Sequence, residues 1–184
     1  MPVQTPICDY GQKAFPFKLK SINNKILSLD DIKGKNGTLV MFICNHCPYV
    51  KAVTKEIIED CNELKKIGVN SVAICSNDAI SHPEDSFENM IKFATQNNFN
   101  FPYLIDETQE IAKAYNAVCT PDFFGYNKNL ELQYRGRLRK LKNLVPVKDG
   151  ESDLLKAMRQ ITKTSEGPIE QIPSAGCSIK WKID

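Results

Sequence analysis

Two cysteines, Cys44 and Cys47, stand three positions apart in the stretch LVMFICNHCPYVK, residues 39–51. Cysteines at this spacing can form a redox pair, in which one thiolate attacks and the second thiol resolves the product. His46 lies between them and could tune a thiol or shape the entrance to the site. Pro48 suits the first turn of a helix, because its missing N–H has no partner to lose there. The pair is therefore expected where a strand gives way to a helix.

Cys47 has the better position for attack. Because it directly precedes Pro48, it faces the unpaired N–H groups and the positive end of the helix macrodipole, which lower a cysteine pKa from about 8.5 toward about 3.5–7.5. Cys44, at the end of the strand, receives less of this field and is the first candidate for the resolving thiol. The alternative is that Cys44 is only a small buried residue. In the alternative interpretation of the motif, Cys44 is the attacking thiol. The preferred interpretation requires a Cys47 sulfur that reagents can reach.

The remaining cysteines divide into candidates and core residues. The chain has seven, an odd number at irregular spacing, which argues against a secreted disulfide framework and favours a reducing cytoplasm. Cys119 and Cys177 are possible resolving residues. Cys177 qualifies if Trp181 anchors the tail beside the active site, because such tails stay ordered only when they dock. Cys61 and Cys75 fall on apolar positions and are predicted to be buried.

A zinc site is an alternative interpretation of the same cluster. Cys44, His46 and Cys47 are suitable ligands, and His82 or Cys119 could supply a fourth. Standard structural sites use two separated pairs, however, and this chain has one compact cluster. We therefore expect no metal and no cofactor. A binding module with vestigial cysteines is a further alternative, since a fold alone does not imply a function.

Composition favours one domain without special partners. The chain has 184 residues, 24 basic and 22 acidic, with a formal charge of +2. We expect a single domain over 1–184, with a core at about 10–163 and a tail, 164–184, that docks on it. The charge balance favours neither nucleic acid nor a membrane as a partner. Neither a signal peptide nor a long apolar run is evident, so a cytoplasmic location is expected, with the oligomeric state left open.

Hydrophobic patterns predict the elements that position the cysteines. The runs TLVMFI and SVAICSN are continuously apolar, which is typical of central strands covered on both faces. Strands are predicted at 38–43, 71–77, 101–106, 123–126 and 130–135, helices at 48–67, 86–97, 107–117 and 152–163, a hairpin within 15–29, and an irregular tail. Successive βα units predict an α/β fold whose mixed central sheet has helices on both faces and an antiparallel last pair.

This order and three motifs resemble the thioredoxin superfamily, in particular the peroxiredoxin-like proteins related to alkyl hydroperoxide reductase and thiol-specific antioxidant. The motifs are FICNHCPYVK, CTPDFF and GCSIKWK. The resemblance implies a thioredoxin-like fold with an N-terminal hairpin extension and a thiol oxidoreductase that uses a thiol or disulfide substrate and an external thiol reductant. CPYV would occupy the place of the redox motif. Pro121, expected to be cis, and Thr120 would present backbone to an extended substrate beside Cys47.

Several positions depart from the family pattern. Peroxiredoxins carry P-x-x-x-T-x-x-C, but here Cys44 stands at the threonine position and Val40 at the proline position. Thioredoxins carry a buried acid where this chain has Met41. Arg135 or Arg137 could partner the thiolate, although both are more typical of solvated strand ends. These departures favour attack by a single thiol, with resolution by another cysteine or an external thiol such as glutathione.

Overall fold

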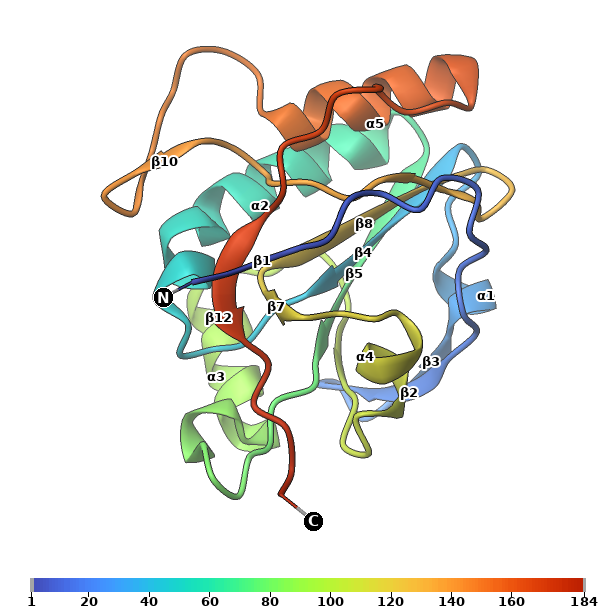
Figure 1. Cartoon of the computed structure of the whole chain (residues 1–184). Coiled ribbons are helices and arrows are strands. Elements are labelled where there is room, and N and C mark those ends of the chain that lie inside the picture. The colour runs from blue at the N-terminus through green and yellow to red at the C-terminus, as the bar shows by residue number, and fades with distance from the viewer. Residues whose placement is uncertain (1, 184) are drawn as a thin grey trace.

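A seven-stranded mixed sheet forms the centre of the molecule (Figure 1). The computed structural model describes residues 2–183. In sheet order the strands are β3 (Ile26–Ser28), β2 (Lys18–Ser21), β6 (Tyr103–Ile105), β5 (Val69–Cys75), β4 (Gly37–Phe42), β8 (Asp122–Asn127) and β9 (Leu132–Tyr134). Strands β4, β5 and β6 are parallel, and the other neighbouring strands pair antiparallel. The predicted mixed sheet, hairpin and antiparallel last pair are confirmed.

Strand β4 leads directly into the candidate site and is buried along its whole length. Leu39 and Met41 face one hydrophobic core, and Val40 and Phe42 face the other. This alternation between two apolar faces explains the continuous run of apolar residues in the sequence. The strand is therefore held on both sides at the point where the cysteine segment begins.

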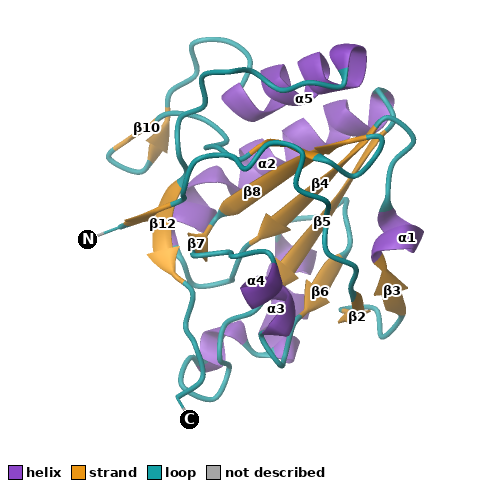
Figure 2. Cartoon of the chain, turned by 45° about the vertical axis from the view of Figure 1, so that its right-hand side comes forward, coloured by secondary structure: helices purple, strands orange, loops and turns teal. Residues whose placement is uncertain are grey.

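Helices cover both faces of the sheet (Figure 2). The helices are α1 (Leu29–Ile32), α2 (Pro48–Lys66), α3 (Phe87–Gln96), α4 (Glu110–Ala114) and α5 (Asp153–Thr164), with a 3₁₀ turn η1 (Pro83–Asp85). Residues of α2, α3 and α5 share one core with the sheet, whereas α1 and α4 contribute to the other. None of the helices within the described residues is long and apolar enough to cross a membrane. The predicted two-sided helical covering is confirmed.

The tail differs from its prediction. Instead of being irregular throughout, it contains the strand β12 (Ala175–Ser178), which lies between β1 (Val3–Gln4) and β7 (Cys119–Thr120). The sequence AGCS shows no alternation, so its strand geometry comes from pairing with distant segments. Gly176 permits the close approach, because a Cβ at this position would collide with the carbonyl oxygen of Thr120.

The β8–β9 connection also differs slightly. Strand β9 begins at Leu132 rather than at the predicted Leu130, because Leu130 has a φ of 58° and cannot continue a strand. A separate hairpin, β10 (Leu141–Lys142) and β11 (Val145–Pro146), precedes α5. Neither difference alters the approach of β4 and β8 to the cysteine segment.

Candidate active site

Cys47 lies at the N-cap of α2, and Pro48 occupies the first helical position. The chain leaves β4 after Phe42 and turns before α2 begins, which places the Cys47 side chain beneath the neighbouring loops. The side chain is 0% exposed. In its protonated form, the Cys47 thiol donates to the carbonyl oxygen of Thr120, with 3.1 Å between Sγ and the oxygen. The structure thus places Cys47 where the helix field acts but shields it from solvent.

Several donors lower the pKa of Cys47 to about 4. The largest contribution is a hydrogen bond from the Cys44 thiol, followed in smaller measure by the N–H of Val50, the hydroxyl of Thr120 and the N–H of Cys177, while burial acts in the opposite direction. The Val50 group is one of the unpaired donors of the first helical turn. Ionisation of Cys47 therefore depends on its immediate neighbours as well as on the helix.

Cys44 acts as the protonated partner in this pair. Its Sγ lies 3.3 Å from Thr120 Oγ1 and 4.0 Å from His46 Nδ1. The hydrogen bond to Cys47 raises the pKa of Cys44 first, and burial raises it further. A proton held on Cys44 can thus stabilise the negative charge on Cys47. The hydroxyl missing at the peroxiredoxin threonine position is supplied near the same sulfurs by Thr120, from a distant loop.

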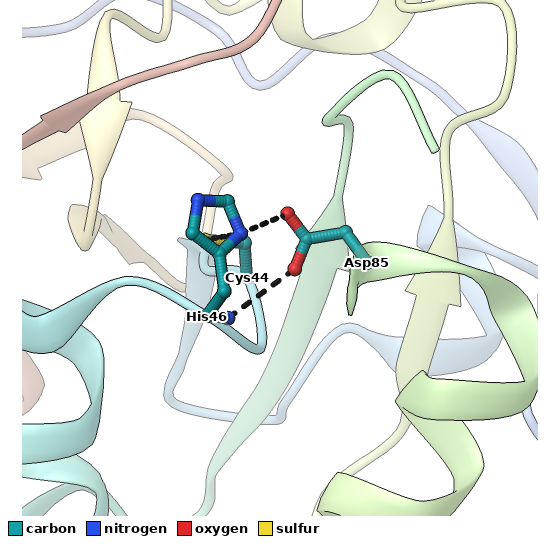
Figure 3. Close-up of side chains that lie close together, drawn as sticks. All are labelled: Cys44, His46 and Asp85. Carbon is teal, nitrogen blue, oxygen red and sulfur yellow. Dashed lines mark hydrogen bonds and ion pairs between the residues drawn. The ribbon is translucent and has the colours of Figure 1, made fainter. Parts of the chain in front are cut away.

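Asp85 orients His46. Its carboxylate lies 2.6 Å from His46 Nδ1, and the two groups face each other beside Cys44 in Figure 3. The same carboxylate accepts the N–H of Asn45 at 2.8 Å, the N–H of His46 at 3.3 Å and the side-chain amide of Asn77 at 2.7 Å. This network fixes the turn that carries the cysteines. Sequence reasoning missed Asp85, although it ends η1, which follows β5, and the carboxyl end of β5 adjoins that of β4.

The geometry of these residues favours a hydrogen-bonded network over a zinc site. Among the described residues, ligand atoms of Cys44, His46 and Asp85 lie within 4.8 Å of one another, a set that lacks Cys47. The 2.6 Å between His46 and Asp85 is shorter than the separation of about 3.3 Å between two tetrahedral zinc ligands. His82 stacks on the His46 ring, with 5.5 Å between centroids, instead of completing a ligand set. A fourth ligand from Cys119 is not part of the cluster either.

The bond between Thr120 and Pro121 is cis, as predicted. The place expected for an extended substrate beside this loop is taken by the chain itself. Strand β12 pairs antiparallel with β7, so that Cys177 lies opposite Thr120 and Ser178 opposite Cys119. The expectation of a readily reachable Cys47 sulfur is wrong for this conformation, because a strand that sequence patterns did not reveal lies over the loop.

Cys119 belongs to β7, and Cys177 belongs to β12. Cys119 is buried, its Sγ is 3.7 Å from the carbonyl oxygen of Pro121, and burial raises its pKa. Cys177 is partly exposed, and burial followed by its hydrogen bond to Cys47 raises its pKa to about 11. Trp181 is 39% exposed, and main-chain pairing in β12 holds the tail beside the active site. The expected anchoring role of Trp181 is therefore replaced by the strand.

The arginines of the YRGR segment are not solvated strand-end residues. Arg135 is 5% exposed and forms an ion pair with Asp122 at 2.9 Å. Arg137 pairs with Asp153 at 2.6 Å. Both guanidinium groups are thus committed to carboxylates, and no contact between either one and Cys47 is present among the described residues. Cys61 and Cys75 are both buried, as predicted.

A hollow of about 270 Å³ adjoins the covered site. Tyr49 lines it from the first turn of α2, Pro121 from the connection between β7 and β8, and Ala175 from β12. Neither Cys47 nor Cys177 lines this hollow. A protein substrate would need the place that β12 occupies.

A sequence model described as the AhpC/TSA family matches residues 10–140. No curated protein matches the chain. Among solved structures, an uncharacterized conserved protein from Geobacillus kaustophilus is 42% identical, with a TM-score of 0.90 and coverage of 100% of this chain and 98% of that one. A hypothetical protein from Sinorhizobium meliloti 1021 is 33% identical, with a TM-score of 0.89 and 98% coverage of both chains.

A more distant likeness concerns the fold alone. The thioredoxin domain of a thiol-disulfide oxidoreductase from Bacteroides vulgatus is 16% identical, with a TM-score of 0.62 and coverage of 84% of this chain and 96% of that one. The predicted thioredoxin-like fold is confirmed.

Proposed function

Because the chain belongs to the AhpC/TSA family, we propose that it is a thiol-dependent oxidoreductase in which Cys47 attacks a disulfide sulfur or a peroxide oxygen. The observation that supports this proposal is the setting of Cys47, whose pKa is lowered to about 4 by donors that converge on its sulfur. A thiolate, not a thiol, is the attacking species. At neutral pH this sulfur is ionised without the need for a separate base.

The neighbouring residues have distinct roles in the proposed reaction. Cys44 and Thr120 donate to the Cys47 sulfur and hold its charge in place. His46, oriented by Asp85, shapes the entrance beside Cys44. Pro48 and the helix that it opens stabilise the thiolate from the opposite side. The resolving thiol is another cysteine of the chain, with Cys44 the choice suggested by spacing, or an external thiol.

The two substrate classes differ in the bond that breaks. With a hydroperoxide, an S–O bond forms on Cys47, the O–O bond breaks, and an alcohol or water leaves after taking one proton. With a disulfide, a mixed disulfide forms on Cys47 and a thiolate leaves. From the sulfenic acid, one thiol forms a disulfide with Cys47 and releases water; from either disulfide, an external thiol then releases the Cys47 thiolate and leaves as an oxidised disulfide. We place this cycle in a single-domain cytoplasmic protein, where such thiols are abundant.

The pH dependence of Cys47 modification tests the proposal. Iodoacetamide labelling followed by mass mapping should show Cys47 reacting with an apparent pKa well below the 8.5 or so of a free cysteine. Consumption of hydrogen peroxide or of oxidised glutathione should be lost in Cys47→Ser. It should persist in Cys61→Ser, because Cys61 lies on the apolar face of α2, away from the site. A Cys47 that titrates like a free cysteine, or that neither oxidant modifies, would contradict the proposal.

A further inference from the structure

Strand β12 lies across the start of α2 and carries Cys177 to the active site (Figure 1, red strand). Cys177 is paired with Thr120, the residue whose carbonyl oxygen lies 3.1 Å from Cys47 Sγ. The N–H of Cys177 donates to the Cys47 sulfur, and the two thiols are also hydrogen-bonded. Two cysteines that are 130 positions apart in the sequence therefore meet at one point.

Of the cysteines around Cys47, Cys177 is the one with solvent-exposed surface. Cys44 and Cys119 are buried, and Cys44 is also held by the Thr120 hydroxyl. An oxidised pair must be attacked by an external thiol to complete a cycle, and attack requires access to one of its sulfurs. A disulfide between Cys44 and Cys47 would have both sulfurs buried beneath β12. A disulfide that includes Cys177 would present one sulfur at the surface.

The attachment of β12 suits a segment that opens locally. The residues that flank it are held by hydrogen bonds, from Ser174 Oγ to the Pro121 carbonyl at 2.7 Å and from the Ile179 N–H to the Val118 carbonyl at 3.3 Å. Ile179 is a buried apolar anchor, whereas Ser178 is exposed. Segments with few buried apolar contacts are drawn from the low end of local stability. A small oxidant needs such an opening to reach Cys47, whose side chain is 0% exposed in the closed arrangement.

We propose that Cys177 is the resolving residue, so that oxidation joins Cys47 to Cys177 and turns β12 from a removable cover into a covalently held strap. This inference rests on the proposed attack by Cys47 and assigns the second thiol. Cys44 then remains a hydrogen-bond donor that stabilises the thiolate.

The electrons balance over two oxidative and two reductive steps. A hydroperoxide oxidises the Cys47 thiolate to a sulfenic acid and is itself reduced to an alcohol or water. The Cys177 thiol then attacks the Cys47 sulfur, forming the disulfide and releasing one water. An external thiol attacks the exposed Cys177 sulfur and releases the Cys47 thiolate. A second external thiol releases Cys177 and leaves as the oxidised external disulfide.

Tryptic mapping of the full chain distinguishes the two possible disulfides. Cleavage after lysine leaves Cys44 and Cys47 together in peptide 36–51 and places Cys177 in peptide 164–180. A Cys44–Cys47 disulfide therefore lowers the mass of one peptide by two hydrogens, whereas a Cys47–Cys177 disulfide links two peptides. The reduced protein is treated with one equivalent of hydrogen peroxide, blocked with iodoacetamide under denaturing conditions and digested.

The variants to compare are Cys44→Ser, Cys177→Ser and the control Cys8→Ser. Cys8 packs in the hydrophobic core on the other face of the sheet, away from Cys47. The linked peptide should be the main oxidised product in wild type, in Cys44→Ser and in Cys8→Ser. In Cys177→Ser it should vanish, and Cys47 should accumulate as a sulfenic acid, which dimedone traps.

Two results would overturn the inference in different ways. A Cys44–Cys47 disulfide within peptide 36–51, in wild type and in Cys177→Ser alike, would assign resolution to Cys44 and leave the reactivity of Cys47 intact. A Cys47 that stays reduced in wild type and every variant with both hydrogen peroxide and oxidised glutathione, while the same oxidants modify a free cysteine peptide, would remove the proposed function together with this inference. Thermal unfolding of each variant shows whether a loss of linkage reflects a loss of fold.

Discussion

The hydrogen bond from Cys44 to Cys47 can be tested by replacing Cys44 with alanine. A hydrogen bond to a charged group contributes about 1.5–3 kcal/mol, and one pKa unit corresponds to about 1.4 kcal/mol. Removal of this donor should therefore raise the pKa of Cys47 by about 1–2 units from its value of about 4. In Cys44→Ser a hydroxyl can still donate, so the pKa should rise less than in the alanine variant.

Thiolate absorbance near 240 nm, followed between pH 3 and pH 8, measures this change. Cys47 should be the thiol that ionises in this range, because burial raises the pKa of Cys8, Cys61, Cys75, Cys119 and Cys177. Subtraction of the Cys47→Ser titration isolates the signal. An unchanged midpoint in Cys44→Ala would refute the assigned role of Cys44, and equal shifts in the alanine and serine variants would show that the donor hydrogen is irrelevant. Far-ultraviolet circular dichroism across the range serves as the folding control.

Three further predictions concern the strand, the oxidised state and a buried acid. In Gly176→Val the new side chain should push β12 off Thr120 and speed labelling of Cys47 by a bulky maleimide, about tenfold if docking weakens by about 1.4 kcal/mol; an unchanged rate would mean that β12 is not the barrier. A Cys47–Cys177 disulfide closes a loop of about 130 residues and should stabilise the protein by about 5 kcal/mol in urea unfolding, against about 2 kcal/mol for a four-residue loop. Burial raises the pKa of Asp60 to about 6 from 3.8, so its stabilising effect is fully present below pH 3.8 and is lost as the pH rises toward 6. Relative to wild type, Asp60→Asn should therefore gain up to about 3 kcal/mol between pH 4 and pH 6, and equal pH profiles in urea unfolding would contradict this account.

The parts of the fold that sequence reasoning predicted are those with strong local patterns. Strand β4 is buried on both faces, and α2 begins at a proline and ends just before Gly68, whose φ of 79° suits a glycine. The position of Cys47 at the start of α2 follows from the same two elements. Local sequence alone therefore predicts that Cys47 lies at a helix terminus.

The parts that it missed depend on contacts between distant segments. His46 follows β4 and Asp85 follows β5, so their interaction joins two separate connections of the fold. The four residues of β12 become a strand only by pairing with β1 and β7. Arg135 resembled a solvated residue because its partner, Asp122, lies on the neighbouring strand. Such pairings are set by the approach of strands in space, which hydrophobic periodicity does not specify.

The cover over Cys47 contributes to the state of the thiolate that it hides. Burial alone would raise the pKa of this sulfur, but the donors offset that effect, and one of them is the N–H of Cys177 in β12. Opening of the strand removes this donor while admitting water and substrate. Opening also relieves the burial, which opposes ionisation more strongly than this one donor favours it, so the sulfur stays ionised at neutral pH when the strand opens. The strand therefore controls access to Cys47 rather than its charge, and a substrate admitted by each opening meets a thiolate.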